Sequence, residues 1–242
     1  MPIDLFGNRV LESGVTINGD YNKRIARDGM RVYLDAENPN SYTGGTTNWN
    51  DLSGYGNHCI WNSAPTWTAP GYFAFDGTAN YGTITKNDSL DCKTGQTLIM
   101  MLRRTTSLVR ENPWNQAYAG YGTWTAEIAN HMSMYFGQGG LYASLTTSAL
   151  TDNEWYFVAS SRSMDRDQKT HRMISYVNGT KYSQVIRDWG GPLATDSNDI
   201  LIGDGYVDPY TGHIGMVLMY NRGLHPYEIA ETFQAIRGRY AL

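Results

Sequence analysis

Four aromatic rings crowd one short and nearly uncharged segment of the sequence. Residues 111–124, ENPWNQAYAGYGTW, hold two tryptophans and two tyrosines, and Glu111 is their only charge. One proline and two glycines interrupt the segment, which favours a loop over a regular strand or helix. Flat rings stack on the apolar faces of sugars, and a nearby amide such as that of Asn115 binds sugar hydroxyls. The segment is therefore a candidate binding surface.

Three interpretations of this segment stay open. The rings form a sugar-binding platform, a protein contact in an interface poor in charge, or a lid over the protein's own core. Burying one such ring contributes about 2 kcal/mol, so four exposed rings would be adhesive unless something covers them. Trp61 and Trp67 form a second patch with the same ambiguity. The candidate carbohydrate or partner contacts are Trp114, Asn115, Tyr118, Tyr121 and Trp124.

A second candidate site is a glycine-rich loop with two carboxylates. The segment GDGYVDPYTG, residues 203–212, carries Asp204 and Asp208 among backbone carbonyls, and calcium prefers oxygen ligands of both kinds. Carboxylates in glycine loops also form turns. No cofactor is expected beyond this possible calcium ion.

Composition and charge exclude two classes of partner. The formal net charge is −4, and no basic run exceeds two residues, so the electrostatic attraction that drives nucleic-acid binding is missing. No apolar stretch reaches the ~20 residues of a membrane helix, so membrane insertion is not expected. The N-terminal sequence MPIDLFGNRV has no signal-peptide pattern, which indicates synthesis in a cytoplasm. Cys59 and Cys92 lack metal-ligand spacing and are expected as two free, buried thiols.

The elements that would position these residues are mostly short strands between glycine and asparagine turns. Residues 1–28 differ in pattern and are expected to form an N-terminal arm or attachment segment outside a domain at 29–242. A type I′ turn is predicted at Asn178-Gly179. One helix is predicted at 225–238, with Pro226 at its start and Gly238 at its C-cap. Predicted strands cover 30–35, 72–75, 81–85, 97–102, 132–136, 141–145, 155–160, 172–177, 180–186, 200–203 and 213–220.

The order of several motifs resembles a known family. GMRVYLDAENPNSY, TNWNDLSGYGNHCIW and GYFAFDGTANYGTI resemble the opening of laminin-G-like, concanavalin A-like lectin jelly-roll domains, and EWYFVA, SYVNGT and ILIGD follow in the family order. The resemblance covers about residues 29 to 240. It implies an all-β jelly-roll sandwich of two antiparallel sheets with one short C-terminal helix. Most motif residues are expected to form turns, with Asp51, Ser53 and Asp76 bonding backbone and Gly54 and Gly56 taking positive φ.

Catalysis is not expected. Glycosidases on this fold carry Glu-x-Asp-x-Glu or a longer variant, placing two carboxylates ~5.5 Å apart, and this motif is absent. Asp165 and Asp167 alternate, but they lie in the polar sequence SMDRDQKTH, typical of a hairpin tip. No Gly-x-Ser-x-Gly elbow or phosphate loop is present.

The resemblance extends to structural proteins of tailed bacteriophages. It implies a non-enzymatic virion protein, a capsid decoration or a tail or fibre component, displayed on the particle surface and made in the host cytoplasm. Its partners would be other virion proteins such as a capsid or tail protein, further copies of itself in a homo-oligomer, or a host glycan. The alternative is a carbohydrate-binding lectin or adhesin module for host or surface attachment.

Overall fold

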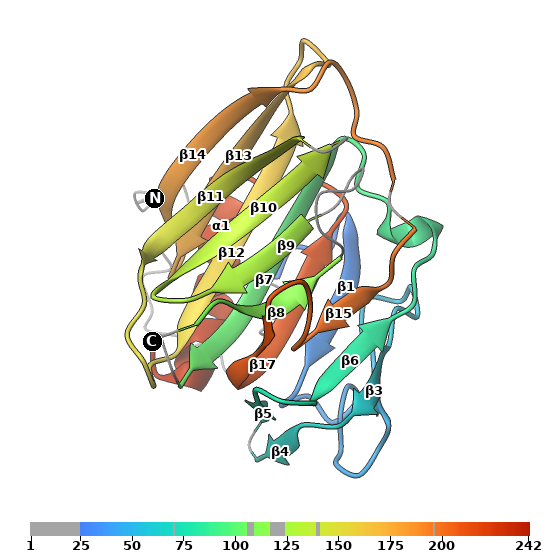
Figure 1. Cartoon of the computed structure of the whole chain (residues 1–242), viewed down its shortest axis with the longest axis vertical. Coiled ribbons are helices and arrows are strands. Elements are labelled where there is room, and N and C mark those ends of the chain that lie inside the picture. Colours follow the sequence, from blue (N-terminus) through green and yellow to red (C-terminus); the bar gives the residue numbers. More distant parts are fainter. Residues whose placement is uncertain (1–24, 70, 106–108, 117–123, 139–140, 196) are drawn as a thin grey trace, which may run out of the picture.

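Two sheets packed face to face form the body of the protein (Figure 1). The computed structural model describes residues 25–69, 71–105, 109–116, 124–138, 141–195 and 197–242. Within these residues, neighbouring strands of both sheets run antiparallel except for one short parallel pair, β16 with β8. The expected jelly-roll sandwich with one short C-terminal helix is confirmed.

The first sheet holds eight strands among the described residues, in the order β14-β13-β12-β7-β17-β5-β4, with β1 also on β17. β5 pairs with the first half of β17 and β1 pairs with the second half, so the two short strands share one edge. The strands are β1 (Met30–Asp35), β4 (Thr66–Thr68), β5 (Tyr72–Asp76), β7 (Gly95–Arg104), β12 (Tyr156–Met164), β13 (Thr170–Val177), β14 (Thr180–Asp188) and β17 (Thr211–Tyr220).

The second sheet holds nine strands in the described part of the chain, in the order β11-β10-β9-β8-β15-β6-β3-β2, with β16 beside β8. The strands are β2 (Asn48–Trp49), β3 (Cys59–Ser63), β6 (Tyr81–Ile84), β8 (Glu111–Asn115), β9 (Trp124–Ile128), β10 (His131–Gln138), β11 (Leu141–Ala149), β15 (Ile200–Ile202) and β16 (Asp208–Pro209).

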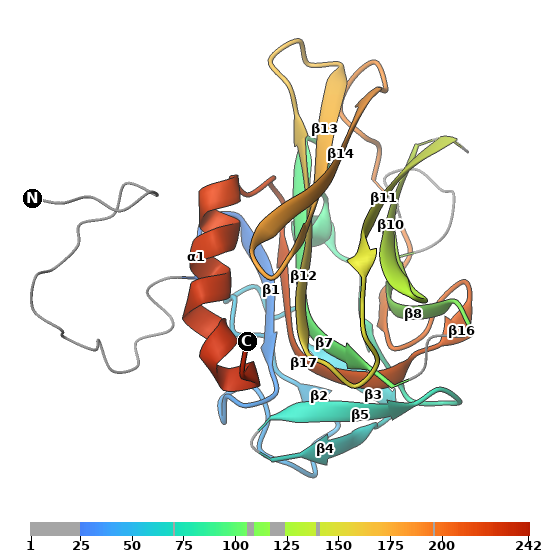
Figure 2. The same ribbon diagram turned by 90° about the vertical axis from the view of Figure 1, so that its left-hand side faces the viewer.

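The central strand β7 is apolar on both faces because each face is covered. Leu98, Met100 and Leu102 point into the core between the sheets, and Ile99 and Met101 point to the outer face. The helix α1 (Pro226–Ile236) covers part of that outer face, as Figure 2 shows. The sandwich therefore has a third layer over the eight-stranded sheet. No helix among the described residues is long and apolar enough to span a membrane.

The predicted turns match the structure. Asn178 and Gly179 both take positive φ, 49° and 75°, at the β13–β14 turn. Asp51 accepts the backbone N–H groups of Tyr33, Ser53 and Asn57 at 2.8, 2.9 and 3.0 Å, and so joins the WNDLSGYGN turn to β1. Gly54 and Gly56 take the expected positive φ. Asp76 accepts the N–H of Thr78 at the start of its turn.

Two predicted boundaries need correction. The proposed arm ended at residue 28, yet Ile25 is buried in the layer under α1 and Asp28 pairs with Arg222 at 3.0 Å. Residues 25–28 thus belong to the domain, and residues 1–24 lie outside the described residues. Gly238 is not the helix C-cap: α1 ends at Ile236, Arg237 is its C-cap, and the chain continues as the 3-10 turn η3 (Arg237–Tyr240), which buries Tyr240.

Candidate functional site

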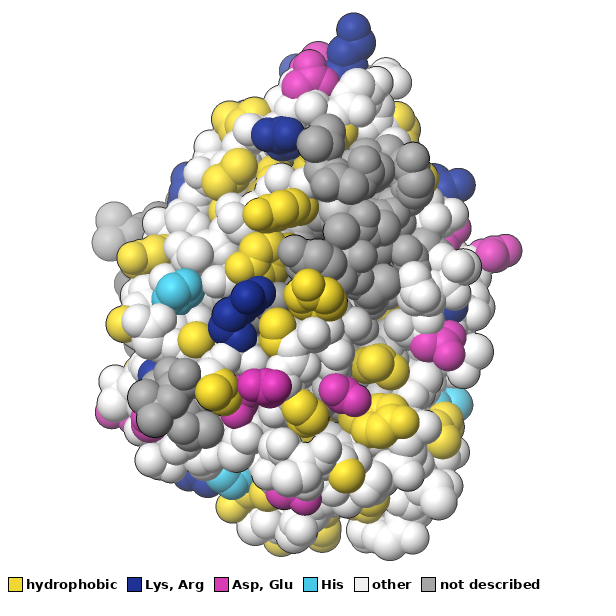
Figure 3. All heavy atoms as spheres, viewed as in Figure 1, with side chains coloured by type: hydrophobic (Ala, Val, Ile, Leu, Met, Phe, Trp, Pro, Cys, Tyr) yellow, Lys and Arg dark blue, Asp and Glu magenta, His cyan; other side chains and the backbone are white. Residues whose placement is uncertain are grey.

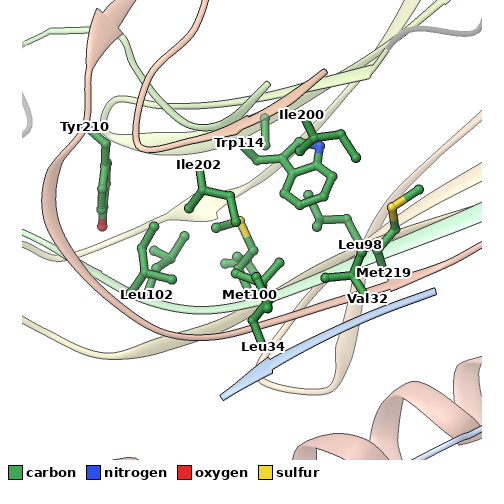
Figure 4. Close-up of a cluster of buried hydrophobic side chains, with 14 of the residues drawn as sticks. Val32, Leu34, Leu98, Met100, Leu102, Trp114, Ile200, Ile202, Tyr210 and Met219 are labelled. Atoms are coloured by element: carbon green, nitrogen blue, oxygen red, sulfur yellow. The ribbon is translucent and has the colours of Figure 1, made fainter. Parts of the chain in front are cut away.

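The first part of the aromatic segment is a strand and not the loop that its composition predicts, and residues 117–123 lie outside the described residues. Residues 111–115 form β8, and the Trp114 side chain is 0% exposed in the core between the sheets. Figure 4 shows its ring beside Ile200 and turned toward Leu98 of the opposite sheet. The prediction that Trp114 is a surface contact is therefore wrong. The prediction treated Pro113 as a break in regular structure. β8 accommodates this proline because the β8–β9 register shifts between Glu111 and Trp114.

Of the other predicted contact residues, the structure describes the side chain of Asn115 alone. Asn115 is buried on β8, so it does not offer its amide to solvent. Trp124 begins β9, and its side chain is outside the described part, as are Tyr118 and Tyr121 altogether. For these three the surface prediction stays a prediction.

The second tryptophan patch belongs to the core. Trp61 stacks on Trp49 with 5.9 Å between ring centroids and meets the Phe73 ring edge-on at 4.7 Å. Trp67 is half-buried and donates its indole N–H to the Ala36 carbonyl at 3.0 Å. Both side chains pack in or against the core between the sheets and stabilise it.

The two carboxylates of the glycine loop show turn chemistry. The Asp204 side chain accepts the N–H of Gly205 at 2.7 Å, and Asp208 lies exposed on β16. Among the described residues, no group of three His, Cys, Asp or Glu side chains is placed to hold a metal ion. Calcium binding here stays a prediction.

A different set of side chains meets on the outer face of the eight-stranded sheet. Arg103 on β7 and His213 on β17 are direct cross-strand partners. Tyr72 starts β5 on the other side of β17, and Trp155 immediately precedes β12 on the other side of β7. Their neighbours Phe73 and Tyr156 pack into the inner core, so Tyr72 and Trp155 point outward. We call Tyr72, Arg103, Trp155 and His213 the Arg103 cluster.

The Arg103 guanidinium contacts two aromatic rings that also contact each other. Its Cζ atom is 5.5 Å from the Tyr72 centroid and 5.4 Å from the Trp155 centroid, within the range of cation–π attraction. The Tyr72 ring meets His213 at 4.9 Å and Trp155 at 5.7 Å, edge-on in both cases. Tyr240 of η3 supports Trp155 from behind at 4.7 Å. The four cluster side chains are half-buried, so each keeps a solvent-facing part.

The cluster carries one formal positive charge. Arg103 Nε donates to His213 Nδ1 at 3.2 Å. Burial, and then the Arg103 charge, lower the pKa of His213, so its imidazole is neutral at neutral pH. In the described part of the chain, no carboxylate pairs with Arg103, and neither the Tyr72 hydroxyl nor the Trp155 indole N–H has a hydrogen-bond partner. A cation, two rings and unused polar groups together suit a polar ring-shaped ligand.

No local sequence signal marks this cluster. Its members come from four strands or strand ends, and only the pairing order β5-β17-β7-β12 brings them together. The opposite outer face, over the nine-stranded sheet, carries an aromatic pair of its own in its described part: Tyr135 and Tyr142 meet edge-on at 5.8 Å. Figure 3 shows hydrophobic side chains interspersed with polar and charged ones on that face.

Closely spaced carboxylates in the described chain are occupied by structural partners. Asp35 and Glu37 both bind Arg239, and Asp35 does so through two bonds, at 3.0 and 2.5 Å. Asp152 pairs with Arg104 at 2.8 Å. Asp165 and Asp167 lie at the β12–β13 hairpin tip as predicted. These carboxylates act as structural ion pairs and turn acceptors.

With the two-sheet architecture established, the family follows from the sequence. A sequence model described as the concanavalin A-like lectin/glucanases superfamily matches residues 76–230. The chain belongs to this superfamily. A search among curated proteins finds no match for this member.

Solved structures with the same fold include toxin binding domains. The binding domain of Paraclostridial Mosquitocidal Protein 1 superposes with a TM-score of 0.63 at 14% identity, covering 86% of this chain and 52% of that one. A structure of botulinum neurotoxin type C, whose cell entry depends on two ganglioside molecules, gives 0.65 at 14% identity, covering 89% and 53%. The botulinum neurotoxin serotype D ligand binding domain in complex with N-acetylneuraminic acid gives 0.65 at 13% identity, covering 86% and 51%.

At these identities the likeness shows a shared fold. The superfamily member described here spans about half the length of those toxin chains. None of these names is that of a virion protein, so the bacteriophage expectation stays a prediction.

Proposed function

We propose that this domain is a non-catalytic carbohydrate-binding module and that the Arg103 cluster is its binding site. The observation that carries the proposal is that Tyr72, Arg103 and Trp155 meet in one group on the outer face of the eight-stranded sheet, where each keeps a solvent-facing part. Rings offer the stacking surfaces that pyranose C–H faces require, and the unused Tyr72 hydroxyl and Trp155 N–H offer hydrogen bonds to sugar hydroxyls.

The comparisons support the same class of ligand. The superfamily contains lectins, and two of the similar toxin domains are named for ganglioside interaction and for a complex with N-acetylneuraminic acid. The bacteriophage virion role, with its capsid or tail partners, is a proposal about where such binding would act, and it rests on the sequence resemblance alone.

The test is a glycan-array screen of four purified proteins, with and without calcium. We expect the wild-type chain to bind a defined subset of glycans, and Tyr72→Ala and Trp155→Ala each to lose most of that binding. The matched control is Tyr182→Ala, which removes a 55% exposed tyrosine on β14. Melting temperatures measured alongside show that each variant is folded.

Two results would contradict the proposal. Silence of the folded wild-type chain across a broad array would exclude carbohydrate binding as its function. Binding that survives both Tyr72→Ala and Trp155→Ala would place the site elsewhere.

A further inference from the structure

We propose that the Arg103 cluster takes a saccharide that bears a carboxylate, with the carboxylate on Arg103 and the sugar ring against Tyr72 or Trp155. This inference rests on the proposed carbohydrate-binding function and adds the chemical class of the ligand. The proposed function uses the rings for stacking on a sugar. This inference adds an ion pair between Arg103 and the carboxylate of the ligand.

The first support is the absence of an internal counter-ion. Three other half-buried or buried arginines are matched by carboxylates: Arg104 by Asp152, Arg222 by Glu228 and Arg239 by Asp35. Arg162 has no carboxylate partner either, but it is fully buried and bonds the Lys93 carbonyl and Gln96, so it is closed to a ligand. Half-buried Arg31 bonds the Met30 carbonyl and lies over the Tyr55 ring alone. Arg103 has aromatic rings and a neutral imidazole around it instead. A half-buried cation without a carboxylate is an open position for an anion, and its attraction is less screened than that of a fully solvated charge.

Nearby acidic side chains do not fill that position. Asp152 is bound by Arg104, and Glu154, next to Trp155, accepts the Tyr156 hydroxyl at 3.0 Å. Glu37, which lies against Gly71 beside Tyr72, is bound by Arg239. Each carboxylate around the cluster thus has its own structural partner.

The second support is that Arg103 keeps N–H donors that can bind a ligand. His213 Nδ1 accepts from Arg103 Nε, so in the neutral imidazole the proton is on Nε2. The approach of Arg103 Nη2 to His213 Nε2 at 3.4 Å is then a contact between two donors and not a hydrogen bond. The terminal guanidinium nitrogens of Arg103 are left to donate to a ligand, whereas the His213 imidazole also bonds the Arg103 backbone. A planar guanidinium matches a planar carboxylate through two parallel bonds.

The third support is the negative net charge of the chain, which does not favour the binding of anions. Its formal net charge is −4, so a preference for acidic sugars has to come from a local group. This makes the preference a specific readout for Arg103.

The experiment is isothermal titration calorimetry with matched acidic and neutral probes. The pairs are 3′-sialyllactose against lactose, and trigalacturonic acid against its methyl ester. We expect the wild-type chain to prefer the acidic member about tenfold or more, as a charge-assisted hydrogen-bonded pair contributes. Arg103→Gln should remove the preference, and Arg103→Lys, which keeps the charge without the planar fork, should keep part of it. The control is Arg187→Gln, an exposed arginine on β14, which should keep the full preference.

The outcomes separate the two proposals. Wild-type binding to neutral glycans with no acidic preference would overturn this inference and leave carbohydrate binding standing. An acidic preference that persists in folded Arg103→Gln would also overturn it. If 3′-sulfolactose bound as tightly as 3′-sialyllactose or more tightly, the site would recognise anions in general, and the assignment of a carboxylate would be overturned. No binding to any glycan would overturn both proposals.

Discussion

Arg103 and His213 face each other across β7 and β17, and the arginine Nε donates to the imidazole Nδ1 at 3.2 Å. The same relationship recurs in the buried interior, where Arg162 Nη1 lies 2.8 Å from His171 Nδ1. His171 Nε2 in turn lies 2.8 Å from the Gly191 carbonyl, which fixes Nε2 as the donor and Nδ1 as the acceptor. Both imidazoles must be neutral to accept a hydrogen bond from an arginine.

The two pairs predict a loss of stability in mild acid. Burial is the main cause that lowers the pKa of His171 and of His213 in the folded chain, while an unfolded histidine titrates near pH 6.5. The unfolded state therefore binds more protons below about pH 6.5, so the stabilisation is complete above that pH and is lost as pH falls. Urea unfolding between pH 7.5 and 5 measures this, with a lower midpoint expected at pH 5.

The His171→Gln variant gives the control for that titration. It should be less stable at pH 7.5 and should depend less on pH in the same window. A wild-type midpoint that is equal or higher at pH 5 would contradict the neutral-imidazole account.

Replacing Trp114 should destabilise the fold strongly. Its side chain is fully buried between the sheets, so Trp114→Ala should lower the free energy of unfolding by about 3–5 kcal/mol, as large-to-small core substitutions do. Denaturant unfolding measures the change. Tyr182→Ala, at an exposed site, should stay within about 0.5 kcal/mol of wild type. A Trp114→Ala variant as stable as wild type would show that the ring is not in the core.

The Asp51 carboxylate should be a major stabiliser of the turn between β2 and β3. It accepts three backbone N–H groups and the Ser53 hydroxyl, so Asp51→Ala leaves several buried donors without a partner. We expect a loss of about 2–3 kcal/mol in unfolding free energy. Asp88→Ala, at an exposed aspartate in η2 (Asp88–Leu90), is the control and should have little effect. Equal effects of the two substitutions would contradict this role.

Alanine substitutions at two glycines with nearly the same φ distinguish the cost of backbone strain from the cost of a steric clash. Gly179 and Gly190 have φ of 75° and 76°, but a Cβ at Gly179 would meet the Phe233 ring of α1 at 2.8 Å, while a Cβ at Gly190 would meet nothing within 4 Å. Gly190→Ala should cost about 1–2 kcal/mol from the left-handed backbone alone. Gly179→Ala should cost clearly more by thermal or urea unfolding. Equal costs would show that the β13–β14 turn does not press on α1.

The fold was predictable where local chemistry dictates it. The strand at residues 30–35 and the hairpin turn at Asn178-Gly179 were predicted correctly, because each depends on neighbours in the sequence. The register shift between Met30 and Val32, which puts Met30 on the outer face, was not predicted. The segment around Pro113 was misjudged, because a proline reads as a break although it occupies a position of shifted register. Tyr72, Arg103, Trp155 and His213 could not be found this way, since long-range strand order alone brings them together.

The central claim is that a glycan binds at the Arg103 cluster, and a nitrogen-15 NMR titration tests it most directly. The chain has seven tryptophans, whose indole N–H signals report on separate places in the fold. With the glycan that binds tightest in the array, the Trp155 indole signal should shift in step with saturation, while the signals of the buried Trp49 and Trp114 should stay in place. A stationary Trp155 signal, with shifts only elsewhere, would contradict the assignment of this site.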